Sequence, residues 1–274
     1  MKPKFLSDGL SEIYQNYDAF FIDLWGVIHN GEHLISSAND ALDQLHKKEK
    51  RFVLMSNAPR PKESIAIYLN KLGFNKHYIK NVYTSGDAAL DALEENKFGK
   101  YFYHLGPRKD EDLFTKFINN KKNAVEEADF ILCTGVDEIN ESNLKFYENF
   151  LQQYSKKKMI CTNPDLVVYR GNKKEYCAGS IAKIFENLGG EVIYFGKPYK
   201  NIYENCAKSN EKILVIGDNL NTDIKGANNM KYDSLLIIDG VHRSEFKKNN
   251  TDNFSKIFTR YNVIVNFIQK KLKW

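Results

Sequence analysis

Four short apolar runs in this chain each end in side chains suited to binding or catalysis. The runs cover residues 19–22, 52–55, 192–195 and 213–216, and the side chains that follow them are Asp23, Ser56, Asn57, Lys197 and Asp218. Apolar runs of this length between turn residues are typical of buried strands. Open parallel sheets bind ligands at the carboxyl ends of their strands, so the repetition predicts one site assembled from several strand ends.

Helical patterns alternate with these strands. Spaced apolar residues predict helices over 38–45, 65–72, 201–208 and 222–230, a further strand over 234–238 and a final amphipathic helix over 264–272. The alternation predicts an α/β fold built on a doubly wound, Rossmann-like parallel sheet with helices on both faces.

The middle of the chain carries a second α/β set. Strands are expected over 101–105, 130–134 and 159–162, and helices over 87–95, 141–154 and 179–188. The chemical motifs concentrate in the outer segments. We therefore expect residues 1–83 and 187–274 to form a core domain, with residues 84–186 inserted into it as a smaller α/β cap domain.

Composition and charge exclude several classes of protein. Hydrophobic residues make up 42% and charged residues 27%, as in soluble globular proteins. The net charge of +5 is spread over many loops, so nucleic-acid binding is not expected. No run approaches the length of a membrane span. Four cysteines without metal-site spacing, and an N-terminus without a signal-peptide pattern, predict a cytoplasmic protein.

Asp23 and Gly26 form the first candidate motif. A carboxylate directly after a buried strand can attack phosphorus and carry an aspartyl-phosphate. A glycine three residues later lets backbone N–H groups approach phosphate oxygens, because it lacks a Cβ. The same pattern also fits an Asp that only caps a turn.

The other motifs supply polar side chains of complementary kinds. Ser56 and Asn57 are suited to hydrogen-bonding phosphoryl oxygens, and Lys197 is suited to neutralising charge. Asp218 and Asp223 stand five residues apart at a strand-to-helix turn and offer the hard oxygen ligands that Mg²⁺ prefers. The alternatives are ordinary loop residues for the first three and a helix N-cap for Asp223.

Taken in order, these segments resemble the haloacid dehalogenase (HAD) superfamily. The NagD-like group of that superfamily has an α/β cap between its second and third motifs. Residues 83–86, 162–165 and 240–241 also match this group, so the resemblance extends over nearly the whole chain. It implies a Mg²⁺-dependent phosphohydrolase that acts on a small phosphorylated metabolite through an aspartyl-phosphate intermediate.

The resemblance also implies roles for single residues. The catalytic pair would be Asp23 and Lys197. The Mg²⁺ ligands would be Asp23, the Trp25 carbonyl, Asp218 and Asp223. The phosphate would be held by Gly26, Ser56, Asn57 and Lys197. The residues that face the substrate from the cap would be Asn163, Asp165, Tyr169 and Arg170.

Trp25 is the residue at which the chain departs from the family. The first motif usually reads Asp-x-Asp, and its second Asp protonates the leaving oxygen and later activates water. An indole N–H donates a hydrogen bond but does not titrate usefully. The acid–base help that is lost is typically worth about 10²–10⁴-fold in rate. His29, four residues on, either replaces the acid or is a loop histidine without a catalytic role.

The Trp25 substitution leaves several functions open. The chain fits a slow phosphatase that prefers good leaving groups, or a catalytically silent protein that binds a phosphorylated ligand. Transfer to an acceptor other than water is a third alternative. The intact Asp23, Lys197 and Asp218 favour the enzyme. A homodimer through the cap also stays open, because no surface pattern is diagnostic of it.

Overall fold

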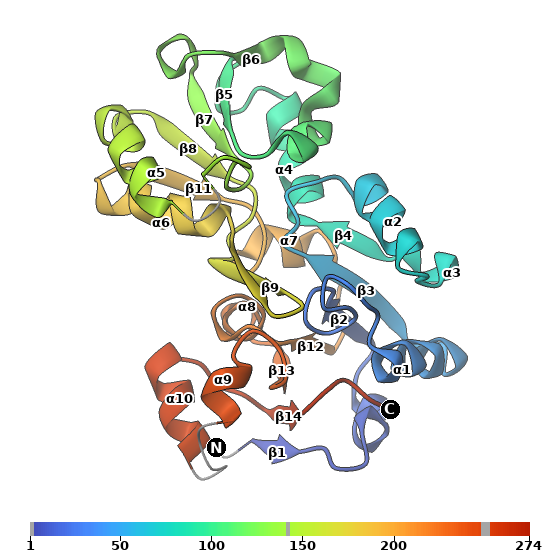
Figure 1. Ribbon diagram of the computed structural model, residues 1–274. Coiled ribbons are helices and arrows are strands. Elements are labelled where there is room, and N and C mark those ends of the chain that lie inside the picture. The colour runs from blue at the N-terminus through green and yellow to red at the C-terminus, as the bar shows by residue number, and fades with distance from the viewer. Residues whose placement is uncertain (1–2, 141–142, 248–252) are drawn as a thin grey trace.

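The computed structural model describes residues 3–140, 143–247 and 253–274, and the larger of its sheets is parallel throughout (Figure 1). Its strand order is β1-β14-β13-β12-β2-β3-β4. These strands are β1 (Lys4–Phe5), β2 (Ala19–Asp23), β3 (Arg51–Ser56), β4 (Val82–Thr84), β12 (Ile213–Gly217), β13 (Asp233–Ile237) and β14 (Phe267–Gln269). The predicted doubly wound parallel sheet is confirmed.

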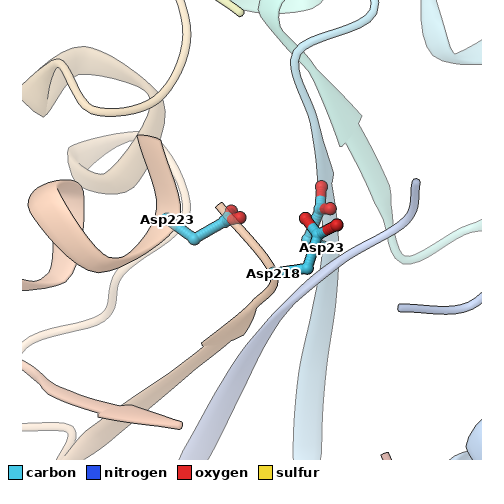
Figure 2. A group of neighbouring side chains, drawn as sticks. All are labelled: Asp23, Asp218 and Asp223. Atoms are coloured by element: carbon cyan, nitrogen blue, oxygen red, sulfur yellow. The ribbon is translucent and has the colours of Figure 1, made fainter. Parts of the chain in front are cut away.

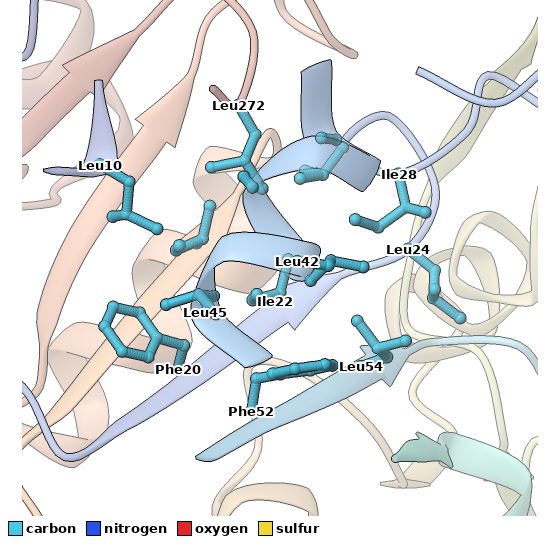
Figure 3. Packing of buried hydrophobic residues seen from close by; sticks show 14 of the residues in the cluster. Leu10, Phe20, Ile22, Leu24, Ile28, Leu42, Leu45, Phe52, Leu54 and Leu272 are labelled. Atoms are coloured by element: carbon cyan, nitrogen blue, oxygen red, sulfur yellow. The ribbon is translucent and has the colours of Figure 1, made fainter. Parts of the chain in front are cut away.

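Helices cover both faces of this sheet. They are η1 (Leu10–Glu12), η2 (Tyr14–Asn16), α1 (Ser36–Lys47), α2 (Lys62–Lys71), α3 (Lys76–Ile79), α7 (Lys200–Glu204), η6 (Leu220–Ile224), α8 (Lys225–Met230), α9 (Arg243–Lys247) and α10 (Phe254–Tyr261). Successive residues of a strand point to opposite faces. Phe20 of β2 belongs to one buried cluster with Leu42 and Leu45 of α1 on one face, as Figure 3 shows. Phe21 packs with Tyr203 of α7 on the other face.

A smaller parallel sheet lies at the far end of the molecule from the termini (Figure 1). Its strand order is β11-β8-β7-β5-β6, with β5 (Phe102–Leu105), β6 (Lys121–Lys122), β7 (Phe130–Cys133), β8 (Lys158–Cys161) and β11 (Glu191–Tyr194). Its helices are α4 (Ser85–Glu94), η3 (Arg108–Asn120), η4 (Val125–Glu127), α5 (Leu144–Leu151), η5 (Gln152–Tyr154) and α6 (Ala178–Asn187). An antiparallel hairpin, β9 (Val167–Arg170) and β10 (Lys173–Tyr176), extends from this part toward the larger sheet.

The start of α4 shows how local sequence fixes the entry into this second part. Thr84 is the N-cap of α4, and its hydroxyl accepts the N–H of Asp87 at 2.9 Å. The Asp87 carboxylate accepts the N–H of Thr84 at 3.0 Å in return. This reciprocal capping satisfies two helix N–H groups that would otherwise lack partners.

Among the described residues, no helix has the length and apolar character needed to cross a membrane.

The strand predicted over 192–195 does not join the larger sheet. Glu191–Tyr194 pairs in parallel with Lys158–Cys161, in the smaller sheet. The core boundary predicted at residue 187 is therefore wrong for this strand, because an apolar run does not reveal which sheet it joins. We keep the division into core and cap as a proposal, with β11 assigned to the cap.

The C-terminal helix predicted over 264–272 is also wrong. Phe267–Gln269 forms β14, which pairs in parallel with β13 on one side and β1 on the other. Hydrogen bonding to two neighbouring strands outweighs a helical spacing that only a few apolar residues support. The amphipathic helix of this region lies just upstream, as α10, which buries Phe254 and Phe258.

Most other predicted elements are confirmed. The predicted helices over 38–45, 65–72, 87–95 and 179–188 correspond to α1, α2, α4 and α6. The helix predicted over 201–208 is shorter, as α7, and the one over 222–230 is divided into η6 and α8. The helix predicted over 141–154 corresponds to α5 and η5, and residues 141–142 lie outside the described residues.

Candidate active site

Three buried carboxylates meet at the carboxyl edge of the larger sheet. Asp23 ends β2, Asp218 follows β12 directly, and Asp223 lies in η6. One oxygen from each lies within 4.8 Å of the other two. Figure 2 shows Asp23 and Asp218 side by side, with the Asp223 carboxylate pointing toward them. The two central strands thus bring together groups that are nearly 200 residues apart in sequence.

Lys197 is the cation that faces these carboxylates. Its Nζ donates to Asp23 Oδ1 at 2.5 Å and to Asp223 Oδ1 at 2.7 Å, and its side chain is only 3% exposed. Burial alone would lower the pKa of Lys197, but the charges of Asp223 and Asp23 raise it well above its usual value. The ammonium therefore stays protonated and holds two carboxylates in fixed positions.

Lys197 reaches this site from the second sheet. It follows β11, which belongs to the smaller sheet, whereas its ammonium lies at the edge of the larger one. Asn57 fixes the loop by accepting the N–H of Lys197 at 2.8 Å and donating to its carbonyl at 3.0 Å. The Asn57 amide therefore positions Lys197, and its side chain also hydrogen-bonds the Asp165 carboxyl. Its role as a phosphate ligand stays a prediction.

Asp218 is held by backbone rather than by Lys197. Its Oδ2 accepts the N–H of Val241 at 2.7 Å. Gly26 has a φ of +92°, and a Cβ at that position would lie 2.1 Å from Asp218 Oδ2. The Gly26 N–H donates to the His29 carbonyl at 2.7 Å. The Gly26 N–H is thus bonded within its own loop, and the glycine is needed because the carboxylate approaches so closely. The part of Gly26 in phosphate binding stays a prediction.

The charges in this cluster fit a bound cation. Asp23, Asp218 and Asp223 carry three negative charges when ionised, and Lys197 supplies one positive charge. Burial, followed by the charge of Asp223, raises the pKa of Asp218 to about 8. An ionised carboxylate at this depth requires a compensating charge. Three carboxylates with hard oxygen donors suit Mg²⁺, with Asp23, Asp218 and Asp223 as the residues that would hold it.

Ser56 is close to the carboxylates and has an unused donor. The residue is buried and lines the cavity at the sheet edge, and its Oγ accepts the N–H of Ala58 at 3.2 Å. Its hydroxyl hydrogen is thus available to a phosphoryl oxygen. The role predicted for Ser56 stays a prediction, as does the role of the Trp25 carbonyl.

The Trp25 side chain joins the loop after β2 to the cap hairpin. Its Nε1–H donates to the carbonyl of Tyr169 in β9 at 2.8 Å. The guanidinium of Arg170 lies 5.0 Å from the indole centroid, a cation–π geometry. Tyr68 of α2 stacks against the indole, with ring planes 6° apart. The indole therefore holds the hairpin in place and offers no titratable proton.

Backbone contacts support the same junction. Gly171, at the hairpin turn, donates its N–H to the Asn30 carbonyl at 3.0 Å. Arg170 Nη1 donates to the Gly31 carbonyl at 3.3 Å, and the Tyr68 hydroxyl donates to the same oxygen at 2.8 Å. The hairpin thus closes over the loop that follows Asp23.

His29 lies behind this junction and does not line the cavity. It is 2% exposed, and its Nδ1 accepts the N–H of Gly31 at 3.1 Å. Burial, together with the charge of Arg170, lowers the pKa of His29 to about 4. A neutral imidazole enclosed by its own loop is poorly placed to act as the missing acid.

The residues predicted on the cap side line the same cavity as the carboxylates. The cavity has a volume of about 500 Å³, and its lining includes Asn163, Asp165, Tyr169 and Arg170. Asp165 is linked to the loop that carries the carboxylates, because Asn219, next to Asp218, donates to it at 3.2 Å. Burial is the main cause that raises the pKa of Asp165 to about 6. The structure therefore brings all four predicted cap residues to this cavity.

Sequence reasoning missed several residues of this cavity. Arg243 lies with its guanidinium 4.9 Å from the Tyr169 ring centroid, and Asn219 bonds Asp165. Arg60, Lys109 and Asp110 also line the cavity. Their local sequences resemble ordinary loops, so only the three-dimensional arrangement identifies them.

Two family profiles match the segments that build this site. One, described as a haloacid dehalogenase-like hydrolase, matches residues 20–117, and the other, described as HAD-hydrolase-like, matches residues 194–258. Phosphoglycolate phosphatase 2 of Arabidopsis thaliana is 23% identical over 88% of this chain and 89% of its own length. A 5′-nucleotidase of Bacillus subtilis is 24% identical over 84% of this chain and 91% of its own. The structure of a haloacid dehalogenase-like hydrolase from Brucella suis 1330 has 28% identity and a TM-score of 0.81, covering 96% of this chain and 98% of that one.

Proposed function

Because the chain belongs to the NagD-like group of the haloacid dehalogenase superfamily of hydrolases, we propose that it is a Mg²⁺-dependent phosphatase of small phosphorylated metabolites. Asp23 takes the phosphoryl group in this proposal. The observation that carries it is the hydrogen bonding of Asp23, whose Oδ1 is held by Lys197 while no described residue bonds Oδ2. A carboxylate fixed through one oxygen keeps the other for attack on phosphorus.

The reaction would proceed in two steps. In the first, Asp23 Oδ2 forms a bond to phosphorus, and the ester oxygen leaves with the electron pair of the broken P–O bond. In the second, water attacks the phosphorus, and Asp23 leaves as a carboxylate. A bound Mg²⁺ would supply electrostatic stabilisation of the phosphoryl oxygens. Lys197 neutralises Asp23 and Asp223, and the Ser56 hydroxyl donates to a phosphoryl oxygen.

Trp25 limits which substrates react quickly. The departing oxygen needs a proton when it is an alkoxide, and the indole has none to give. We infer that esters with stable leaving groups, such as aryl or acyl phosphates, are turned over faster than alkyl esters. The same substitution favours the second candidate function, a silent protein that binds a phosphorylated ligand. The buried nucleophile with its lysine supports the enzyme over the silent protein.

Phosphate release from 4-nitrophenyl phosphate and acetyl phosphate, with Mg²⁺ and with a chelator, tests this proposal. We expect turnover only with Mg²⁺, and its loss in Asp23→Asn and Asp218→Asn. Asp40→Asn, on the exposed side of α1, is the matched control and should keep full activity. Turnover that survives in Asp23→Asn would contradict the mechanism. Phosphate binding without turnover in the wild type would favour the silent protein.

A further inference from the structure

The cavity continues beyond the carboxylate cluster to the carboxyl edge of the smaller sheet. There it is lined by Asp110 of η3 and by Thr134, which follows β7. A phosphoryl group fills only part of a cavity of about 500 Å³. The carboxyl edge of a parallel sheet is where such folds bind ligands, so this arm of the cavity is placed for the rest of a substrate.

A buried polar cluster is built into this arm. His104 Nε2 lies 2.9 Å from Thr134 Oγ1, and the Thr134 hydroxyl bonds the Asp110 carboxylate. Thr134 is 1% exposed and Asp110 is 3% exposed. A Cβ on Gly106 would lie 2.0 Å from Thr134 Oγ1, so a glycine is needed where the strands bring these groups together. Polar groups therefore occupy buried positions that apolar side chains usually fill, and they hold a carboxylate at the cavity wall.

The Asp110 carboxylate has acceptor capacity to spare. Among the described residues, Thr134 is the side-chain donor to it, whereas a carboxylate can accept about four hydrogen bonds. Buried acceptors are normally satisfied. Neither Asp110 nor Thr134 takes part in the chemistry at Asp23. The cluster therefore points to a ligand group that donates hydrogen bonds.

The surroundings of Asp110 favour neutral donors over a cation. The positive charges of Lys109 and Arg60 act on this carboxyl. They would repel an ammonium group of a ligand placed beside it. Burial raises the pKa of Asp110 to about 7 in spite of those charges. A carboxyl with this pKa is only partly ionised at neutral pH, so it attracts a cation less than an ordinary carboxylate does, which suits hydroxyl groups.

We propose that Asp110, oriented by Thr134 and His104, is a specificity residue that accepts hydrogen bonds from hydroxyl groups at the end of the substrate remote from phosphorus. The substrate class is then a phosphorylated polyol or sugar. This inference rests on the proposed function, since it assumes that the phosphoryl group lies at Asp23. It adds a recognition subsite in the cap to the chemistry of the core.

Calorimetric binding with Mg²⁺ tests the subsite independently of turnover. The probes are sorbitol 6-phosphate and hexyl phosphate, which have the same chain length but differ in hydroxyl groups. We expect the wild type to prefer the polyol. In Asp110→Asn its affinity should fall about threefold to tenfold, the effect of losing one hydrogen bond to a carboxyl that is only partly ionised. Hexyl phosphate and inorganic phosphate should bind unchanged.

Thr134→Val is the second variant, because it keeps the shape of the side chain and removes only the hydroxyl. It should weaken the binding of sorbitol 6-phosphate several-fold. Thr115→Val, on the exposed side of η3, is the matched control and should leave that binding unchanged. Equal losses for both probes would show that the cluster is only structural. No preference for the polyol in the wild type, or tighter binding of 6-aminohexyl phosphate, would overturn the proposal.

The outcomes also separate this inference from the proposed function. If 4-nitrophenyl phosphate is not hydrolysed but the polyol preference depends on Asp110, the subsite stands and the phosphatase proposal falls. If turnover depends on Asp23 but the polyol is not preferred, the phosphatase proposal stands and the subsite falls.

Discussion

Replacing Trp25 by Asp restores the usual acid but removes a contact that holds the cap hairpin. The indole donates one hydrogen bond, to the Tyr169 carbonyl, and receives the Arg170 guanidinium over its ring. A neutral hydrogen bond contributes about 0.5–1.5 kcal/mol. A cation–π contact at a partly exposed site contributes about 0.5–2 kcal/mol. We therefore expect Trp25→Asp to weaken the closed hairpin by about 1–3.5 kcal/mol.

The restored acid acts in the opposite direction, and only on some substrates. General acid catalysis is worth about 10²–10⁴-fold, which corresponds to roughly 3–5 kcal/mol of barrier. An alkyl ester needs the proton and gains that amount, so its kcat/KM should rise despite the weaker hairpin. An acyl phosphate needs no proton and bears only the loss, so its kcat/KM should fall.

The assay is a plot of log kcat/KM against leaving-group pKa for a series of phosphate esters. Trp25→Asp should give a shallower slope than the wild type. Trp25→Phe is the matched control, because it keeps an aromatic ring and loses the hydrogen bond. It should lower kcat/KM equally for all substrates and leave the slope unchanged. Equal slopes in the wild type and Trp25→Asp would refute the reasoning, since another group would then supply the proton.

Three further predictions concern the carboxylate cluster. Lys197→Met leaves Asp23 and Asp223 without their ammonium, and breaking a buried ion pair costs about 3–5 kcal/mol. The Tm of the metal-free protein should therefore fall sharply, and Mg²⁺ should recover part of the loss. An unchanged Tm would contradict the pairing. Gly26→Ala should abolish the rise in Tm caused by Mg²⁺, because its Cβ would meet Asp218 Oδ2; Gly73→Ala, at a φ of +81° with nothing within 4 Å, carries the same backbone strain and should keep that rise. The pKa of Asp218 is raised to about 8 from a usual 3.8, so the folded protein without metal holds a proton that the unfolded chain has lost. As the pH rises from 4 to 8, the stability of the metal-free protein should therefore fall, and the rise in Tm caused by Mg²⁺ should grow. If the rise in Tm caused by Mg²⁺ does not change with pH, Asp218 is not a ligand.

The sequence predicted the central part of the site because its signals are local. Asp23 and Asp218 each follow a run of apolar residues that is buried on both faces of the sheet, and such runs are recognisable without a structure. Parallel strands then bring their ends to one edge. The three-carboxylate cluster follows from these facts and from the position of Asp223 in the next turn.

The rest depends on contacts between distant segments. Nothing near Lys197 indicates that its strand joins the smaller sheet, or that Asn57 holds its backbone. Two partners of Trp25, Tyr169 and Arg170, lie more than 140 residues away on a hairpin that the sequence did not predict. Asp110 and Thr134 stand in segments with no motif. Pairing and burial of this kind are decided by tertiary packing, which local patterns do not encode.

The central claim, that Asp23 takes the phosphoryl group with a metal held by its neighbours, is tested most directly by trapping the intermediate. The protein is mixed with acetyl phosphate and Mg²⁺, quenched in acid, digested, and analysed by mass spectrometry for a phosphoryl group that hydroxylamine removes. We predict that the label appears on Asp23, requires Mg²⁺, and is absent from Asp23→Asn and Asp218→Asn. A label on any other residue, or turnover of acetyl phosphate with no label on Asp23 at any quench time, would contradict the account.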